Sequence, residues 1–518
     1  MGGPTAGNLL NLIPATRHLT GNDPFHDTMR HPAVAVLIAL LTVVAGCNAP
    51  TALSSGATTA GALDAADRAP PEHDVVGWEN GYWYDSKLSI TPGNGLNASE
   101  REAVVSRAMA RVEKIRHLEF TQSVPVNVTT RAAFRNRTTG GDSGGNAGSD
   151  DPARLFDNVE HEALFLVGEH DDSVSASKET TSQTVLGFYS SRTKAIVIVS
   201  DSATPRIRDE RTLAHELVHA LQDQHFDLRY NASTEDGHDA RLGLVEGDAM
   251  VVEQAYTNRC GSQWQCLGDD GGNDGANGGS TGGGGSTSGP GHMGLYLASI
   301  FPYTDGSGFV RSLRARGGWD AVNAAYTDSP VSSEQIIHPK RYPGDRPVTV
   351  TIRDSPDAGW QRVRPPGPDY DRLGQALMST MFMYTLYDSY NRTAVVSPRD
   401  VLNVDPSGDV NATDPLNYGL TYTDGWDGDR LLVYRRGTET AYVWKSVWES
   451  DRDAAEFAAG YRRLLEHWGG HRVGPNRWVV TDDSQFSDAF ELRVRGDTVT
   501  IVNAPTAVDL SDVAPGGS

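Results

Sequence analysis

Residues 215–219 read His-Glu-Leu-Val-His, and this segment has the residue types and spacing best suited to chemistry. His215 and His219 are four residues apart, so on a helix both imidazoles lie on one face and can bind the same metal ion. Glu216 lies beside the open side of that metal, where a carboxylate can take a proton from a water molecule. Acidic residues lead into the segment and leucines recur at helical spacing, which favours a helix. The segment therefore predicts metal-assisted hydrolysis with Glu216 as the general base.

A metal site of this kind needs a third protein ligand, and the sequence offers two residues for that role. Glu246 lies in a second segment, residues 241–256, whose apolar residues also recur at helical spacing. His225 follows His215 by ten residues, but Gln222 stands where a glycine would be needed to break the helix and turn His225 back towards the metal. On an unbroken helix the two histidines point about 80° apart. Glu246 is the expected third ligand, and His225 is the alternative.

Four more residues are expected to support this site. Asp223, one turn beyond the second histidine, and Asp248, two residues after the expected third ligand, can accept hydrogen bonds that fix the histidine tautomers. Hydrolysis also generates an oxyanion that needs a hydrogen-bond donor, and we expect His338 or Tyr326 to supply it. The alternative for each of the four is an ordinary role in packing or at a solvated surface.

The motif and its expected third ligand resemble the gluzincin clan of zinc metallopeptidases. The resemblance covers mainly residues 185–256 and implies that Zn2+ is bound by His215, His219 and Glu246. It also implies an endopeptidase-like reaction on a peptide or protein substrate, in which an activated water molecule attacks the peptide carbonyl and Glu216 delivers a proton to the leaving amine. A GxMEN-type motif is absent from the sequence, so an aminopeptidase is not favoured.

The hydrophobic pattern predicts a fold of the α+β class. Two strands form a hairpin directly before the motif helix, an order that resembles the zincin core of a mixed sheet plus an active-site helix. In that core an edge strand commonly holds an extended substrate by backbone hydrogen bonds. The expected strands are residues 163–167, 185–189 and 194–199, and the expected helices are residues 97–120, 309–326 (interrupted at Gly317-Gly318) and 373–387.

The chain is long enough for more than one domain. We expect a zincin-like domain at residues 73–415, with low-complexity loops at 140–151 and 267–291. A small C-terminal α+β module is expected at residues 420–505, with two strands, a helix capped by Ser450 and three further strands. Its tryptophans indicate a core rather than a carbohydrate-binding surface, and the module shows no pattern that indicates chemistry.

The first 72 residues resemble an export and anchoring segment. The apolar stretch in it is too short to span a bilayer comfortably but suits a signal peptide. Small residues followed by Cys47 resemble a lipobox, and a plain signal peptide with an accidental cysteine is the alternative. We therefore expect an extension at residues 1–28, a lipoprotein signal peptide at 29–46 and a flexible tether at 47–72. The protein would then be at the cell surface, lipid-anchored to the outer face of the cytoplasmic membrane.

The number of cysteines and the net charge indicate a disulfide, a type of source and the partners that are disfavoured. Cys260 and Cys266 remain as an even pair in an exported chain, which favours a disulfide. The net charge is −22, and only six of the 45 basic residues are lysines. Such an acidic chain suits solution in high salt, which predicts a halophilic source, and it disfavours nucleic acid as a direct partner.

Two other functions remain open from the sequence. The chain could be a non-catalytic, zinc-containing surface lipoprotein with a role in adhesion or envelope architecture. Glu216 argues against that function, because a structural metal site has no use for a general base. Metal-dependent hydrolysis of a bond other than a peptide bond is the third possibility.

Overall fold

The structure is a computed structural model that describes ten stretches of the chain. These are residues 68–90, 95–134, 151–182, 187–200, 210–229, 232–267, 291–388, 393–411, 413–481 and 483–514. The predicted extension, signal peptide and Cys47 lipid site lie outside the described residues, as do most of the tether and nearly all of the two predicted loops. Within the described part of the chain, no helix has both the length and the hydrophobicity needed to cross a bilayer.

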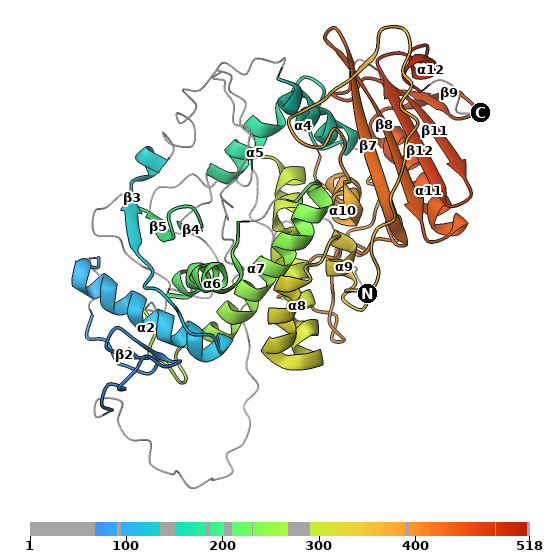
Figure 1. The fold of residues 1–518 in the computed structure, drawn as a ribbon. Coiled ribbons are helices and arrows are strands. Elements are labelled where there is room, and N and C mark those ends of the chain that lie inside the picture. The colour runs from blue at the N-terminus through green and yellow to red at the C-terminus, as the bar shows by residue number, and fades with distance from the viewer. Residues whose placement is uncertain are drawn as a thin grey trace.

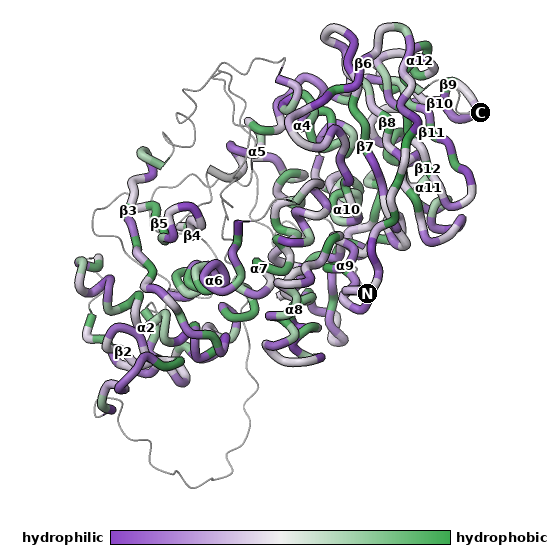
Figure 2. Tube along the Cα trace, viewed as in Figure 1, coloured by the Kyte–Doolittle hydropathy of each residue, from purple (hydrophilic) through white to green (hydrophobic). Residues whose placement is uncertain are grey.

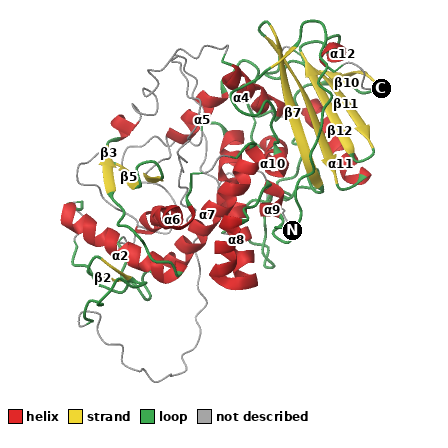
Figure 3. Ribbon diagram, in the orientation of Figure 1, coloured by secondary structure: helices red, strands yellow, loops and turns green. Residues whose placement is uncertain are grey.

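The fold is of the α+β class, with helices in the middle and sheets on two sides (Figures 1 and 3). The central helices are α6 (Glu210–Phe226), α7 (Glu235–Thr257) and α8 (Met293–Thr327). A small three-stranded sheet lies on one side of them, and a seven-stranded sheet, formed late in the chain, lies on the other.

The three-stranded sheet has the order β3-β5-β4, with β3 (Val126–Thr129) parallel and β4 (Gly187–Ser190) antiparallel to β5 (Ala195–Val199). The predicted hairpin ahead of the motif helix is therefore confirmed. Among the described strands, β4 forms one edge of this sheet.

A short hairpin and a helix come before this sheet in the sequence, and the helix packs against α6 and α7. The hairpin joins β1 (Trp78–Glu79) to β2 (Tyr82–Trp83), and it is followed by α2 (Ala98–Arg116). Asn97 starts α2 with a capping box, because its side chain accepts from the backbone of Glu100 and the Glu100 side chain accepts from Asn97 in return. The predicted helix at residues 97–120 is thus confirmed, although it ends four residues early.

The strand predicted at residues 163–167 is wrong. Helix α4 (Pro152–Ala163) ends there, and a turn with Phe165 at φ 53° leads towards α5 (Ser173–Ser182). The run is apolar because it is buried: the Phe165 ring packs against Trp468 and Phe486 at centroid distances of 6.2 and 5.0 Å. A short apolar run does not distinguish a strand from the buried end of a helix.

Helices α7 and α8 approach each other unusually closely, through glycines. A Cβ atom at Gly247 would overlap the backbone of Gly306, and a Cβ atom at Gly306 would overlap the carbonyl of Gly243. The predicted interruption at Gly317-Gly318 is confirmed, since both residues have non-helical backbone angles within α8. Two shorter helices, α9 (Ser333–Ile337) and α10 (Gly374–Tyr384), complete the helical part.

The seven-stranded sheet is antiparallel throughout. Its strand order is β6 (Gln361–Arg362), β7 (Trp426–Arg436), β8 (Glu439–Trp448), β12 (Thr498–Ala504), β11 (Ala489–Arg495), β10 (Arg477–Val479) and β9 (His471–Gly474). The prediction found the two strands, the helix and three later strands, and the structure adds β9 and the distant β6.

Both faces of this sheet are buried, and hydrophobic residues lie along its central strands (Figure 2). One face, with Leu431 and Trp444, packs in the main core beside α11 (Asp451–His467). The other face, with Leu432 and Val443, forms a second core with α12 (Leu510–Val513). Ser450 caps α11, and the tryptophans of the module are core residues, as predicted.

Candidate metal centre

His215, His219 and Glu246 meet in the interior between α6 and α7. Glu246 Oε2 lies 3.4 Å from Nε2 of His215 and 3.3 Å from Nε2 of His219. The three residues are 0%, 2% and 1% exposed. Their ligand atoms all lie within 4.8 Å of one another, which is close enough for one ion to contact all three.

The polar atoms of this cluster test whether a metal ion fits. Both Nε2 atoms and both carboxylate oxygens of Glu246 are shielded from solvent and have no hydrogen-bond partner among the described residues. Such groups are costly to bury unpaired. Two imidazole nitrogens and one carboxylate oxygen are a donor set that suits zinc, with a fourth position left for water or substrate. The donor set of the residues present therefore fits a zinc ion.

Each histidine is oriented through its second ring nitrogen. Nδ1 of His215 lies 3.0 Å from Oε2 of Glu253 on α7, and a carboxylate can only accept, so Nδ1 carries the proton. Nδ1 of His219 lies 2.9 Å from Oε1 of Gln222, whose Nε2 donates to the carbonyl of Val245 at 2.9 Å. Both Nε2 lone pairs are thereby directed at the cluster.

Gln222 and Glu253 therefore hold the positions that the sequence analysis assigned to Asp223 and Asp248, and that assignment is corrected. Asp223 instead accepts from the Tyr189 hydroxyl and Lys194 Nζ, both at 2.6 Å. Asp248 points towards α2 and α8, as described below. On a helix the side chains of consecutive residues point about 100° apart. Gln222, three residues after His219, therefore contacts the histidine. Its neighbour Asp223 points in another direction.

Tyr326 and His338, the residues expected to stabilise an oxyanion, lie elsewhere. The Tyr326 hydroxyl donates to Asp248 at 2.9 Å, and Asp248 also pairs with Arg116 at 2.9 Å. His338 follows α9 and contacts the side chain of Gln375 at 3.2 Å. In the described part of the chain, both side chains therefore make their polar contacts with residues outside the cluster.

Tyr303 of α8 lies at the cluster instead. Its ring stacks on the ring of His215 at a centroid distance of 6.3 Å and an angle of 19°. Burial, together with the negative charges of Glu246 and Glu216, raises the pKa of Tyr303 well above its ordinary value, so the hydroxyl keeps its proton. Tyr303 was not predicted from the sequence, because the helix was expected to begin at residue 309 and Tyr303 has no local signal of its own.

Glu216, the expected base, is 1% exposed and lies between the cluster and β4. Its Oε2 accepts from the backbone N–H of Tyr189 at 2.8 Å, and its Oε1 has no partner among the described residues. Burial raises the pKa of Glu216, against the opposing effect of the two histidines. One oxygen is thus held by the strand while the other is available for a proton.

The histidines and Glu246 shift one another's pKa values. Burial opposes a charge on His215, but Glu246 and Glu253 outweigh it and raise the pKa of His215 to about 10. Burial likewise opposes ionisation of Glu246, but His219 and His215 lower its pKa to about 2. Glu246 is therefore an anion that attracts either protons on the imidazoles or a metal ion in their place.

His225, the alternative third ligand, is directed away from the cluster. It lies near the end of α6, where its Nε2 is 2.7 Å from the carbonyl oxygen of Glu119. Helix α6 continues unbroken past Gln222, as the absence of a glycine there predicts.

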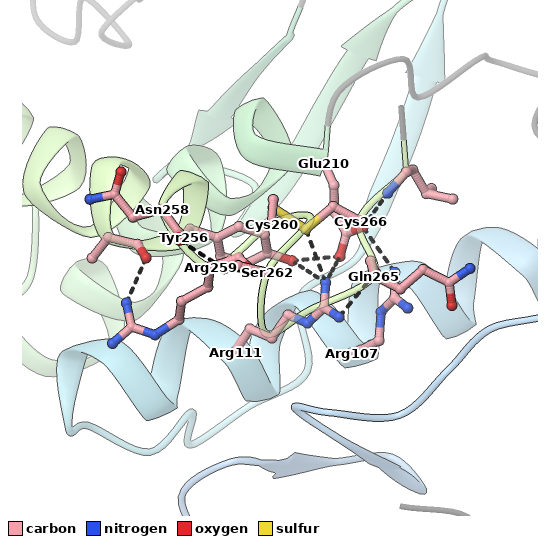
Figure 4. The surroundings of a disulfide bond; sticks show 12 residues. Arg107, Arg111, Glu210, Tyr256, Asn258, Arg259, Cys260, Ser262, Gln265 and Cys266 are labelled. Atoms are coloured by element: carbon pink, nitrogen blue, oxygen red, sulfur yellow. Dashed lines mark hydrogen bonds and ion pairs between the residues drawn. A yellow bond between two sulfur atoms is a disulfide. The ribbon is translucent and has the colours of Figure 1, made fainter. Parts of the chain in front are cut away.

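A buried charge network beside a disulfide fixes the start of α6 (Figure 4). Glu210, the first residue of α6, pairs with Arg107 at 2.9 Å and with Arg111 at 2.7 Å, both from α2. Its carboxylate also accepts from the backbone of Leu267 at 2.9 Å. The predicted disulfide between Cys260 and Cys266 closes the loop that ends at Leu267, after α7. The network thus ties the motif helix to the segment that follows the helix carrying Glu246.

The described chain is thus an α+β protein with a buried three-residue site of metal-binding chemistry. Residues 361–514 match the model of a family described as "Domain of unknown function (DUF8575)". This segment contains the seven-stranded sheet with α10, α11 and α12, and it excludes the cluster. No curated protein and no solved structure matches the chain. The chemistry of the cluster is therefore the basis for a functional proposal.

Proposed function

We propose that the protein is a zinc-dependent endopeptidase with a gluzincin-like site and a zincin-like core. The observation that carries the proposal is the convergence beside Glu216 of His215 Nε2, His219 Nε2 and Glu246 Oε2, all buried and without a hydrogen-bond partner among the described residues. A structural zinc site commonly has four protein ligands, whereas three ligands and a neighbouring carboxylate are typical of hydrolytic sites. The order of strands β3, β4 and β5 ahead of α6 supports the zincin-like core.

The residues of the chain would divide the reaction between them. His215, His219 and Glu246 would hold the zinc ion, which supplies a Lewis acid that activates water and polarises the peptide carbonyl. Glu216 would take a proton from the attacking water on Oε1 and deliver it to the leaving amine. The N–H of Tyr189 keeps the other oxygen in place, so the base is oriented before the substrate binds.

Strand β4 is the element best placed to hold the substrate. It is an edge strand among those described, and the Tyr189 N–H that bonds Glu216 points away from β5. An extended peptide could pair with this edge next to the Tyr189 N–H, which Glu216 already occupies, and the peptide backbone would then lie beside the base.

Tyr303 is the residue that we assign to the oxyanion. Its hydroxyl remains protonated next to two carboxylates and can donate to an oxygen that gains negative charge during attack. It would take the role that the sequence analysis gave to His338 or Tyr326.

The location of the protein remains a prediction of the sequence. A lipid anchor at Cys47, a site on the outer face of the cytoplasmic membrane and a halophilic source fit a secreted peptidase that works close to the cell. The competing function is a surface lipoprotein that binds zinc without catalysis, for adhesion or envelope architecture. Its supporting observation is the large C-terminal sheet, which carries no assigned chemistry.

Substitution of the base tests the proposal directly. Wild type, Glu216→Gln and the exposed control Glu439→Gln are compared for cleavage of an unfolded protein and for bound zinc, in molar salt. We expect Glu216→Gln to keep its zinc and to lose activity by about 100- to 10,000-fold, because general base catalysis is lost. Equal inactivity of wild type and variant with stoichiometric zinc would favour the non-catalytic function. Absence of zinc from all three proteins would contradict the site.

A further inference from the structure

A pocket of about 480 Å3 opens at the C-terminal end of α6. Three elements contribute to it: the last turn of α6 with the residues after it, the turn between β4 and β5, and the end of α8. The lining residues are Lys194, Asp223, Gln224, His225, Phe226, Asp227, Arg229, Tyr326 and Thr327.

One residue connects this pocket to the candidate active site. The backbone N–H of Tyr189 donates to Glu216, and the hydroxyl of the same residue donates to Asp223 in the pocket wall. Glu216 and Asp223 are seven residues apart on α6, which corresponds to about 10 Å along the helix axis. That distance equals about three residues of extended chain, so a peptide on the edge of β4 with its scissile bond at Glu216 can reach the pocket.

The pocket offers hydrogen-bond donors, because its two acids are already paired with its two cations and the cations keep further N–H groups. The Asp223 side chain is 0% exposed and accepts from Tyr189, Lys194 and the backbone of Leu228. Asp227 is paired with Arg229 at 2.9 Å. Lys194 is different: its side chain is 48% exposed, and the bond to Asp223 uses only one of its three N–H groups.

Two aromatic side chains form part of the pocket lining. The rings of Phe226 and Tyr326 stack at a centroid distance of 4.1 Å and an angle of 11°. An ammonium group and aromatic rings in the same pocket suit a ligand with a short aliphatic stem and a terminal anion.

We propose that this pocket binds a carboxylate group of the peptide substrate through Lys194, within about three residues of the scissile bond. The inference rests on the proposed peptidase function and adds a substrate class to it: peptides that carry an acidic group near the cleavage site. The carboxylate can belong to an Asp or Glu side chain or to the C-terminus of a short peptide.

Paired peptides test the proposal. A peptide with a single cleavage site is made with Glu or Gln at each of the three positions on either side of the bond, with a free or an amidated C-terminus. Wild type, Lys194→Met and the control Arg192→Met, an exposed cation in the same turn, are compared. Binding of the same peptides to the Glu216→Gln protein is measured separately, so that recognition is read without cleavage.

We expect one Glu peptide, or the free C-terminus, to be preferred about five- to tenfold in kcat/KM by wild type, mostly through KM. The ratio of the two kcat/KM values should fall to about one in Lys194→Met and stay as in wild type in Arg192→Met. In wild type it should decrease as the salt concentration is raised. Side-chain and C-terminal sources are separated by which pair of peptides shows the effect.

Two results would contradict the inference, and a third would uphold it while contradicting the proposed peptidase function. Equal cleavage of all pairs by wild type contradicts a carboxylate subsite. An equal loss for Glu and Gln peptides in Lys194→Met shows that Lys194 acts only by holding Asp223 and Tyr189, which also contradicts it. Lys194-dependent binding of acidic peptides without cleavage by wild type would uphold the pocket and contradict the peptidase.

Discussion

Glu253 lies 3.0 Å from Nδ1 of His215, seven residues after Glu246 on the same helix. Seven residues are two helical turns, so one face of α7 carries both Glu246, a proposed metal ligand, and the residue that orients the imidazole of His215. From the opposite helix, Gln222 joins His219 to the carbonyl of Val245, immediately before Glu246. The positions of α6 and α7 are thus coupled by the same side chains that direct the imidazoles.

Removal of Glu253 should weaken metal binding without unfolding the protein. Glu253→Ala leaves Nδ1 of His215 without its acceptor, and we expect zinc affinity to fall about 10- to 100-fold. The same range is expected for Gln222→Ala. Affinity is measured by competition with a chromophoric chelator. Gln254→Ala, on the same helix but turned towards Asn258, is the control and should bind zinc as wild type does. Unchanged affinity in Glu253→Ala would show that the contact has no role in the site.

Loss of the Tyr303 hydroxyl should affect the reaction and not the metal. Tyr303→Phe keeps the ring that stacks on His215 but removes the donor, so we expect kcat to fall about 10- to 1,000-fold with zinc content unchanged. Tyr296→Phe, on the same helix, serves as the control. Loss of zinc in Tyr303→Phe would instead mean that the hydroxyl supports the Glu246 carboxylate.

The close approach of α7 and α8 should be intolerant of a single methyl group. In Gly247→Ala the new Cβ meets the backbone of Gly306, which cannot move away as a side chain can. We expect a loss in the free energy of unfolding of about 1–3 kcal/mol or more, together with weaker zinc binding, because Glu246 and Tyr303 are displaced. Gly308→Ala is the matched control, since its Cβ would come no closer than 3.6 Å to Asp414 Oδ2. Denaturant titration of both variants measures the difference.

Three carboxyl groups, those of Glu79, Glu113 and Glu119, should make stability fall as pH rises. Burial, with repulsion from Asp74, raises the pKa of Glu79 and Glu119 to about 7, and burial raises the pKa of Glu113 to about 9. Between the unfolded value of 4.5 and these values the folded protein binds more protons than the unfolded chain. Stability is therefore lost as pH rises through about 7 to 9.

Glu119→Gln tests this dependence. It removes one of the repelling charges, so the melting temperature should fall less between pH 5 and pH 9 than in wild type. Glu102→Gln, on the exposed face of α2, is the control and should follow wild type. An identical decline in Glu119→Gln would contradict an electrostatic origin in this group.

Local pattern predicted the elements that bear the candidate site. The spacing of His215 and His219 requires only a helix, and the leucines and the acidic lead-in residues of α6 favour one. The hairpin β4–β5, the interruption at Gly317-Gly318 and the cap at Ser450 are likewise set by neighbouring residues. Glu246 was found because its helix has a clear apolar period and because a third ligand was needed.

The wrong or missing predictions have separate physical causes. Phe165 was placed in a strand because burial makes any short segment apolar, whatever its backbone conformation. Helical spacing favours Glu253, seven residues from Glu246, over Asp248, but it does not distinguish Gln222 from Asp223, which follow His219 by three and four residues. Tyr303 lies on a third helix, so no helical spacing relates it to His219 or Glu246.

The sequence by itself determined the helices that carry His215, His219 and Glu246, the charge of the chain and the cysteines available for a disulfide, because each depends on residues that are close in the chain. Only the tertiary structure decided which residues surround His215 and His219. That choice depends on the approach of α7 and α8 through Gly243, Gly247 and Gly306, which brings Tyr303 beside His215. Contacts between helices depend on side-chain volume at their crossing point, and no pattern along a single segment contains that information.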